Sequence, residues 1–324
     1  MAMDPSIILC PLTAALIADP SRVLCLDGGF ATELEARGHD LTGALWSARL
    51  VLEDPAAVQS VHADFYRAGA DVGISATYQA SVQGFQQVLG LSEAEAIDAT
   101  RQALRLACAA RDEVAPEIVA AGRPRPLVAM SVGPWGATAA DGSEYTGTYP
   151  AAMTAEALAD FHQRRLVATL QGLDPSAWPD VLACETIPSV CEVGAVCVAL
   201  EAAAREVGRP LRAWVTVSCR DGALTSSGEP FAAAVELADR CASVVAVGVN
   251  CTPPQHVLDL LTVARGLTAK HLVAYPNRGE TYDAVSHAWV EGSGVGCKST
   301  DSAQHTRMLF VNTALCVRRP SSEL

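Results

Sequence analysis

A repeated alternation of short apolar runs with longer helical patterns constrains the fold of this chain more than any other feature. Seven runs of mostly small and β-branched residues, each ending in small or polar residues, are typical of strands. They are Val23–Gly29, Ala70–Tyr78, Leu127–Pro134, Asp180–Pro188, Leu211–Ser218, Val244–Asn250 and His271–Asn277. Helical patterns between them cover Leu91–Arg111, Thr154–Gly172, Glu192–Val207, Glu229–Cys241 and Gln255–Leu267. Continuous apolar runs indicate strands buried on both faces, as in a parallel sheet.

The number of these units favours a closed barrel over an open sheet. Seven or eight strand–helix units without a composition break indicate one α/β domain, and this number fits a (β/α)₈ barrel. The short Asp27-Gly28-Gly29 turn is not the G-x-G-x-x-G fingerprint of a dinucleotide-binding sheet. We therefore predict a single-domain TIM barrel over residues 21–317. An N-terminal extension with a first helix covers residues 1–20, and a tail covers residues 318–324.

The repeating pattern is weakest at the C-terminal end. The chain after Asn277 has room for one short helix, expected over Tyr282–Val290, because a crossover between parallel strands needs about 12 residues. The candidate eighth strand, Gly294–Ser299, has few β-branched residues, and a last helix over Ser302–Val317 would close the ring. We expect the region of the seventh helix and eighth strand to be shortened or irregular.

Charge and cysteine usage narrow the classes of partner. The formal net charge of −13 argues against nucleic acid, and it is compatible with a cationic small substrate or simply with solubility. Eleven scattered cysteines without C-x-x-C spacing are typical of reduced thiols. No apolar run approaches the ~20 residues of a membrane span. We predict a cytoplasmic protein that binds small molecules and neither nucleic acid nor membrane; its oligomeric state stays open.

Polar residues follow most of the predicted strands, where a parallel barrel places its chemistry. They are Asp27, Thr77, Tyr78, Glu185, Asn250, Cys251, Asn277 and Cys297. Asp27 beside Gly28 and Gly29 joins an acid to bare backbone N–H groups, which suits an amino acid ligand. Taken singly, these residues are better explained by a turn whose glycines supply a positive φ. The carboxylate of Glu185 at the end of an apolar strand requires a cation, either a ligand or a structural arginine.

Two cysteines stand at predicted strand ends. Cys251 and Cys297 end the sixth and eighth strands, and two thiolates with a third ligand and an open position describe a catalytic zinc site. Such a site holds a thiol substrate as the thiolate, which is its nucleophilic form. A free cysteine is more often a small buried hydrophobe. The seven histidines form no H-x-x-x-H pair, and no G-x-S-x-G motif supports a serine hydrolase.

Several short motifs along the chain together resemble one family. They are Leu26–Leu34, Leu45–Ser47, Thr77–Ser81, Ser131–Gly136, Asp141–Tyr145, Glu185–Pro188, Gly248–Thr252 and Tyr275–Glu280. This set resembles the homocysteine S-methyltransferases, which are zinc-dependent (β/α)₈ enzymes, from about Leu24 to Trp289. The resemblance implies that Asp27 and Glu185 hold the amino acid end of homocysteine and that Cys251 is a zinc ligand.

The remaining site residues follow from their place at the same strand ends. Gly28, Gly29, Thr77, Tyr78 and Asn250 complete the predicted substrate-binding set. The resemblance implies that the other zinc ligands come from a Gly-Gly-Cys-Cys-Arg-Thr-Thr motif. Here Cys297 matches its second cysteine, while Gly296 stands in place of the first. No catalytic residue is predicted beyond the metal site.

The resemblance implies methyl transfer from a sulfonium donor, S-methylmethionine or S-adenosylmethionine, to the zinc-activated thiol of L-homocysteine, giving methionine. The absence of a glycine-rich nucleotide loop favours the smaller donor. Because Gly296 replaces a cysteine, the alternative is a catalytically impaired relative that only binds an amino acid. A barrel lyase without a metal is a third and more distant hypothesis.

Overall fold

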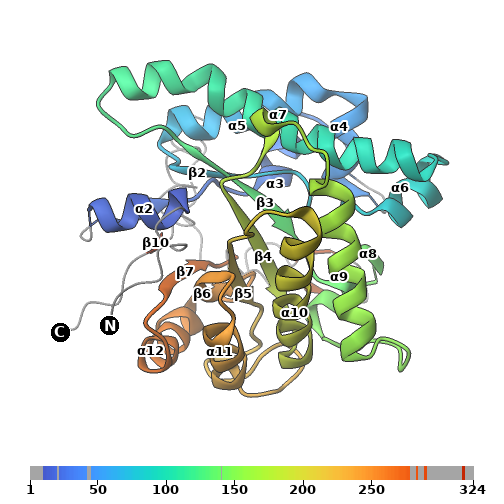
Figure 1. Cartoon of the computed structure of the whole chain (residues 1–324), viewed down its shortest axis with the longest axis vertical. Helices are drawn as coiled ribbons and strands as arrows, with labels where there is room; N and C mark the ends of the chain where they lie inside the picture. Colours follow the sequence, from blue (N-terminus) through green and yellow to red (C-terminus); the bar gives the residue numbers. More distant parts are fainter. Residues whose placement is uncertain are drawn as a thin grey trace.

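A curved parallel sheet forms the centre of the molecule (Figure 1). The computed structural model describes residues 10–19, 22–41, 45–139 and 141–277, and the backbone of three short strands beyond them. The six strands are β2 (Val72–Ile74), β3 (Leu127–Val132), β4 (Val181–Ile187), β5 (Ala213–Val217), β6 (Val244–Asn250) and β7 (His271–Tyr275). They lie in sequence order and every neighbouring pair is parallel. The predicted parallel α/β architecture is confirmed as a half-barrel sheet.

The first predicted strand is shorter than expected. Only β1 (Leu24–Cys25) is a strand, and Leu26 forms one parallel bridge with Val72 of β2. β1 pairs in antiparallel fashion with β10 (Cys316–Val317), the last described piece of the chain. Beside β2, the first described strand of the chain, β1, therefore pairs with the last one, β10.

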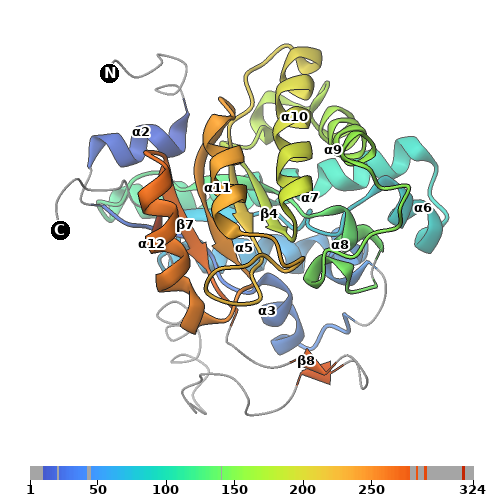
Figure 2. The same cartoon turned by 90° about the horizontal axis from the view of Figure 1, so that it is seen from below.

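The longest helices cover the outer side of the sheet. They are α5 (Pro55–Ala68), α7 (Glu93–Ala120), α9 (Ala155–Leu170), α10 (Val190–Val207), α11 (Phe231–Arg240) and α12 (Val257–Leu267). Figure 2 shows α9 to α12 side by side along the strands β4 to β7. Their starts follow capping chemistry: Asp54, Thr154 and Ser189 each accept a backbone N–H, and Ser92 with Glu95 forms a capping box.

The smaller elements lie in the connections. They are α2 (Pro11–Ala18), α3 (Phe30–Ala36), α4 (Leu50–Glu53), α6 (Val82–Leu89) and α8 (Trp135–Ala139), with the 3₁₀ turns η1 (Trp46–Arg49), η2 (Ser143–Tyr145), η3 (Pro175–Ala177) and η4 (Pro254–His256). In the described residues, no helix combines the length and hydropathy that crossing a membrane requires.

The two faces of the sheet form two separate cores. Outward residues such as Met130 and Val215 pack against Leu166 and Leu200 of the helices. Inward residues, among them Trp214, pack with Leu12 and Leu16 of α2. Side chains alternate between the faces of a strand, so each strand contributes to both cores. The inner core fills the amino-terminal half of the sheet and leaves the carboxyl ends for polar residues.

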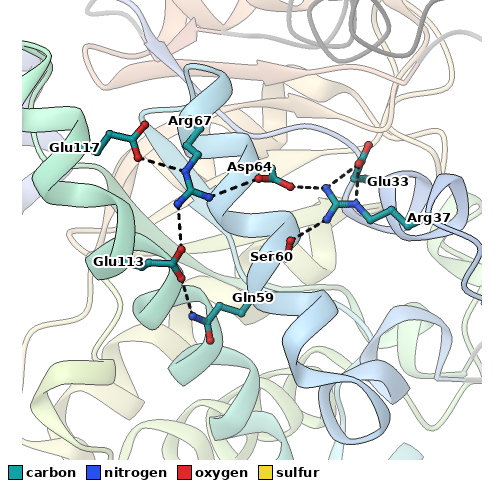
Figure 3. A network of polar contacts seen from close by, with 8 residues as sticks. All are labelled: Glu33, Arg37, Gln59, Ser60, Asp64, Arg67, Glu113 and Glu117. Carbon is teal, nitrogen blue, oxygen red and sulfur yellow. Dashed lines mark hydrogen bonds and ion pairs between the residues drawn. The ribbon is translucent and has the colours of Figure 1, made fainter.

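A network of charged side chains joins α3, α5 and α7 at the surface (Figure 3). It comprises Glu33, Arg37, Gln59, Ser60, Asp64, Arg67, Glu113 and Glu117. Arg37 and Arg67 share Asp64, with N–O distances of 2.9 and 3.7 Å. Exposed pairs of this kind contribute about 0–1 kcal/mol each, so the network positions the helices more than it stabilises the fold.

The C-terminal helices predicted from the sequence are wrong where the structure describes them. Within the expected helix Tyr282–Val290, β8 (Tyr282–Asp283) pairs antiparallel with β9 (Ala288–Trp289). Tyr and Trp favour strands, where they pair across a hairpin, and this preference overrides the short helical pattern. The expected helix Ser302–Val317 ends in strand β10. The candidate eighth strand Gly294–Ser299, including Cys297, lies outside the described residues.

Helix α7 also differs from its predicted bounds. It continues past the expected end at Arg111 to Ala120 and contains Pro116. The polar residues after Arg111 are compatible with helix because they face outward to other charges: Asp112 pairs with Arg125 at 2.8 Å and Glu113 with Arg67 at 3.1 Å. The other four predicted helices agree with the structure to within two residues at each end.

Candidate active site

Polar side chains gather on the inner face at the carboxyl ends of the strands. On each strand they follow an inward apolar residue by two positions, so both point to the same side. The polar residues are Ser131, Glu185, Thr216, Asn250 and Tyr275, and the apolar or small ones before them are Ala129, Ala183, Trp214, Gly248 and Val273. This change from apolar to polar along one face marks where a ligand can replace the packed core.

Glu185 lies at the centre of this group and is 7% exposed. Its Oε1 accepts a hydrogen bond from the Ser131 hydroxyl, and Tyr275 also bonds to it. Burial raises the pKa of Glu185, while the bonds from Ser131 and Tyr275 and the charge of Arg165 oppose that rise. No ion pair joins Glu185 to an arginine in the described part of the chain. A cation bound beside Glu185 would favour its ionised form.

Asp27 is the second buried carboxylate, also 7% exposed. It follows β1, and its Oδ2 accepts a hydrogen bond of 2.7 Å from the backbone N–H of Ile74 in β2. Burial raises the pKa of Asp27 well above 3.8, and the negative charge of Glu185 raises it further. Two carboxylates that oppose each other's ionisation form a site that a single cation, such as an ammonium group, would relieve.

The glycines beside Asp27 are required by packing rather than by a turn. Neither Gly28 nor Gly29 has a positive φ, so the turn explanation from the sequence is wrong. A Cβ on Gly28 would lie 2.8 Å from the ring of Phe65 in α5. Gly29 is the N-cap of α3 with an extended backbone. The absence of a side chain at Gly28 lets the Asp27 segment approach α5 closely.

Cys251 stands in a tight arrangement with Asn250 and Thr186. Both Cys251 and Thr186 adopt left-handed backbone conformations, with φ of 46° and 61°. The Asn250 Oδ1 accepts from the Thr186 N–H at 2.7 Å, and its Nδ2 donates to the Thr186 Oγ1 at 2.7 Å. The Cys251 Sγ lies 3.4 Å from Asn250 Nδ2 and 3.6 Å from Thr186 Oγ1. Asn250 thus holds two strained residues in place.

The electrostatics of Cys251 indicate a need for a cation. Burial raises the pKa of its thiol to about 11, although the hydrogen bonds from Thr186 and Asn250 work in the opposite direction. The charges of Glu185 and Glu144 raise it further. A thiol in these surroundings is protonated at neutral pH unless a positive ion binds beside it.

Thr77 and Tyr78 are fixed from behind by Arg165 of α9. The Arg165 guanidinium donates to the carbonyl oxygens of Thr77 at 2.7 Å, Tyr78 at 3.0 Å and Gly133 at 3.0 Å. Thr77 is fully buried, and its hydroxyl donates to the Ser131 carbonyl at 2.7 Å. Burial raises the pKa of Tyr78, and the neighbouring charges of Cys251 and Glu144 add to this. The phenol therefore lies beside the Cys251 group.

Two functional groups were not predicted from the sequence as site residues. Arg165 positions the Tyr78 segment, and Glu192 holds the β3–α9 connection. Glu192 is fully buried and accepts from the Trp135 N–H at 2.7 Å and the Tyr149 hydroxyl at 2.6 Å; it also lies 3.0 Å from His162 Nε2. A signal was present, since an acid on the first turn of a helix covered by apolar residues requires buried partners.

The described residues do not by themselves complete a metal site. They contain no group of three or more His, Cys, Asp or Glu side chains that could hold a metal ion. Cys251 offers one sulfur ligand at the strand ends, and the predicted partner Cys297 lies outside the described residues. Among the described residues, Cys251 therefore offers one sulfur ligand of a thiolate site.

The fold and this site define a parallel α/β protein with a half-barrel sheet, whose strand ends bring two buried carboxylates close to a thiol. The chain belongs to the homocysteine S-methyltransferase family, since the model of that family matches residues 24–304.

Similar proteins agree with this family over most of their length. Homocysteine S-methyltransferase 4 of Zea mays is 44% identical over 272 residues, covering 83% of this chain and 77% of that protein. Homocysteine S-methyltransferase YbgG of Bacillus subtilis is 39% identical over 288 residues, covering 89% and 86%. The crystal structure of the homocysteine methyltransferase MmuM from Escherichia coli, in a metallated form, matches with a TM-score of 0.72 and 40% identity, covering 84% of this chain and 89% of that one.

Proposed function

We propose that this protein transfers a methyl group from S-methylmethionine to the thiol of L-homocysteine, forming methionine. The observation that carries the proposal is the pair of buried carboxylates, Asp27 and Glu185, which face a ligand without a structural arginine. Family membership supplies the reaction class. In this proposal residues 21–317 form a (β/α)₈ barrel with a leading segment over 1–20 and a tail over 318–324, and the ring closes through the chain after residue 277.

The acceptor is held by its amino acid end. The ammonium group of homocysteine sits between Asp27 and Glu185, which favours their ionised forms, and the backbone beside Gly28 and Gly29 approaches the carboxylate. Tyr78 and Asn250, with Thr77 beneath them, shape the wall that the thiol of homocysteine approaches. This arrangement directs the acceptor sulfur toward Cys251.

The metal ligands in this proposal are Cys251 and Cys297. A zinc ion bound there would lower the pKa of the acceptor thiol, so that the thiolate is available at neutral pH. The residues of this chain contribute the orientation: Asn250 and Thr186 aim the Cys251 sulfur, and the carboxylates fix the acceptor. No side chain is required as a general base.

The transfer itself balances without another reactant. The acceptor thiol releases its proton to solvent on becoming the thiolate. Its sulfur then attacks the methyl carbon in line, a carbon–sulfur bond forms, and the bond to the donor sulfur breaks. The electron pair goes to the donor sulfur, which changes from a cationic sulfonium to a neutral thioether. Positioning of two substrates supplies much of the rate of such a displacement. S-adenosylmethionine is the alternative donor, and the chain shows no glycine-rich nucleotide loop that favours it.

The partners in this proposal are small molecules, and the reaction takes place in the cytoplasm. The nine cysteines whose side chains the structure describes are free thiols, which supports a reducing compartment. The net charge of −13 disfavours a nucleic acid partner.

The test is zinc content and turnover of the purified full chain. We expect about one zinc per chain and methionine formation from homocysteine with S-methylmethionine, faster than with S-adenosylmethionine. Cys251→Ser should lose both zinc and turnover, whereas Cys191→Ser, on an exposed part of α10, should keep both. A chain that binds homocysteine but neither zinc nor methyl donor would instead be the impaired relative that Gly296 suggests.

A further inference from the structure

A buried carboxylate outside the Asp27–Glu185 pair lies in a turn that contacts β4. Glu144 belongs to η2, in the connection between β3 and α9, and it is 7% exposed. Its Oε2 is buried and has no hydrogen-bond partner, and no described lysine, arginine or histidine forms an ion pair with it. A buried carboxylate without a partner is costly, so its position in the fold requires a compensating cation.

The backbone around Glu144 is held firmly, so the carboxylate is placed by the fold. Gly136 of α8 packs so tightly against η2 that a Cβ there would lie 2.5 Å from the Glu144 nitrogen. The Ser218 hydroxyl after β5 donates to the Glu144 carbonyl at 3.4 Å. Asp141 caps the turn through the Ser143 N–H at 3.0 Å. These contacts fix the backbone of a residue whose Oε2 has no hydrogen-bond partner.

The electrostatic neighbours of Glu144 show which part of the site it serves. Its negative charge raises the pKa of both the Cys251 thiol and the Tyr78 phenol. The geometry agrees, because η2 contacts β4 and the Glu144 carbonyl accepts from Ser218 after β5. The Glu144 carboxylate therefore belongs to the same strand ends as Cys251.

We propose that Glu144 binds the sulfonium charge of the methyl donor. This inference rests on the proposed function, which supplies a donor with a permanent positive charge at the atom that must face the acceptor sulfur. Asp27 and Glu185 are already assigned to the acceptor, and Glu192 is occupied by its bonds to Trp135 and Tyr149, which leaves Glu144 for the donor. The ligand class is an organic cation whose charge is carried by sulfur beside a transferable methyl group.

The chemistry predicts an effect on donor binding rather than on the rate of transfer. As the acceptor thiolate attacks, the sulfonium loses its charge, so the pairing with Glu144 is strongest before the reaction and weaker in the transition state. An interaction that favours the bound donor lowers KM and does not raise kcat. Removing the charge of Glu144 should therefore raise the KM for the donor without lowering kcat.

The experiment compares the zinc-loaded wild-type chain with Glu144→Gln at saturating homocysteine. We expect the KM for S-methylmethionine to rise at least about tenfold, which corresponds to about 1.4 kcal/mol of lost binding, with kcat and the KM for homocysteine retained. The second probe is 2-amino-5-methylhexanoate, in which an uncharged CH replaces the sulfonium sulfur. Its inhibition constant should not change, because it keeps the ammonium group but lacks the charge that Glu144 binds.

The control is Asp141→Asn, an exposed acid in the same turn whose amide oxygen still accepts from Ser143. It should leave both constants unchanged. An unchanged KM for S-methylmethionine in Glu144→Gln would overturn the inference. An equal rise in the inhibition constant of 2-amino-5-methylhexanoate would also overturn it, because Glu144 would then bind the ammonium group. If the wild-type chain does not turn over S-methylmethionine, the proposed function fails. Calorimetric binding of S-methylmethionine to the two chains then decides the role of Glu144 separately, and absence of binding to both overturns it.

Discussion

The side-chain amide of Asn250 binds Thr186 twice, accepting from its N–H and donating to its hydroxyl, at 2.7 Å each. Through these two hydrogen bonds, the end of β6 fixes the backbone of Thr186, which follows Glu185 on β4. The two strands are not neighbours, because β5 lies between them. The geometry of the carboxylate and of the thiol thus depends on a single amide.

Loss of that amide should damage both stability and the metal site. Asn250→Ala leaves the buried N–H of Thr186 without a partner, and we expect the free energy of unfolding to fall by about 2–3 kcal/mol. Zinc affinity should fall as well, because Cys251 loses the contact that orients it. Denaturant unfolding and a zinc titration measure the two effects. Thr186→Ser keeps both bonds and relieves the β-branch at a positive φ, so it should be neutral or stabilising.

The buried acid Asp27 should make stability depend on pH. Its pKa is raised in the folded state, so above about pH 4 the unfolded chain releases its proton first and the free energy of unfolding falls as pH rises. Asp27→Asn removes this pH-dependent loss of stability. The variant should therefore exceed the wild type in free energy of unfolding at pH 8, and the difference should be smaller at pH 5. It should also bind homocysteine at least about tenfold more weakly. Urea unfolding at the two pH values tests this.

The exposed Asp160 on α9 is the control for that measurement. Asp160→Asn removes the same charge from the surface, and its difference from wild type should be the same at both pH values. A stability of Asp27→Asn that is lower than wild type at pH 8 would contradict the argument.

Glu192 should be one of the most sensitive positions outside the strands. Glu192→Ala leaves the Trp135 N–H and the Tyr149 hydroxyl without their acceptor, and we expect a loss of about 3–5 kcal/mol of stability. Glu206→Ala, on the exposed side of the same helix, removes one surface contact to Gln163 and should change stability by less than about 0.5 kcal/mol. Thermal and denaturant unfolding of the two variants measure this difference in stability.

Two glycines should respond in opposite directions to the same substitution. Gly248 in β6 pairs with Val273 in β7, and a Cβ there would lie 1.6 Å from the Val273 carbonyl oxygen. Gly248→Ala should therefore cost about 3 kcal/mol or more, or prevent folding. Gly266 in α12 has open space around it, so Gly266→Ala should gain up to about 1 kcal/mol. Equal changes in the free energy of unfolding for the two variants would contradict this prediction. They would mean that β6 and β7 move apart at Gly248 to make room for the Cβ.

Much of the sheet is predictable from sequence because its strands are buried on both sides. All seven residues of β4 and of β6 are buried, and such runs leave few alternatives. Likewise, Glu185, Asn250 and Cys251 are visible as polar interruptions at the ends of apolar runs. What the sequence shows, then, is where a strand stops and which group stands there.

The remaining features depend on contacts between distant segments. The place of Glu192 on the first turn of α10 signals a need for buried partners, but the sequence does not show that Trp135 and Tyr149 supply them. Gly28 is required because the ring of Phe65, on α5, leaves no room for a side chain there. The β8–β9 hairpin is missed because short segments with mixed patterns take their structure from their pairing partner.

The order of the strands has a consequence for how the chain is made. From β3 to β7 each strand pairs with the strand synthesised just before it, so a chain emerging from the ribosome always finds its next neighbour already in place. Strand β1 is the exception, because its antiparallel partner β10 is the last described segment to be synthesised. The segment that leads into Asp27 therefore waits for nearly the whole of translation before its own backbone pairing is complete.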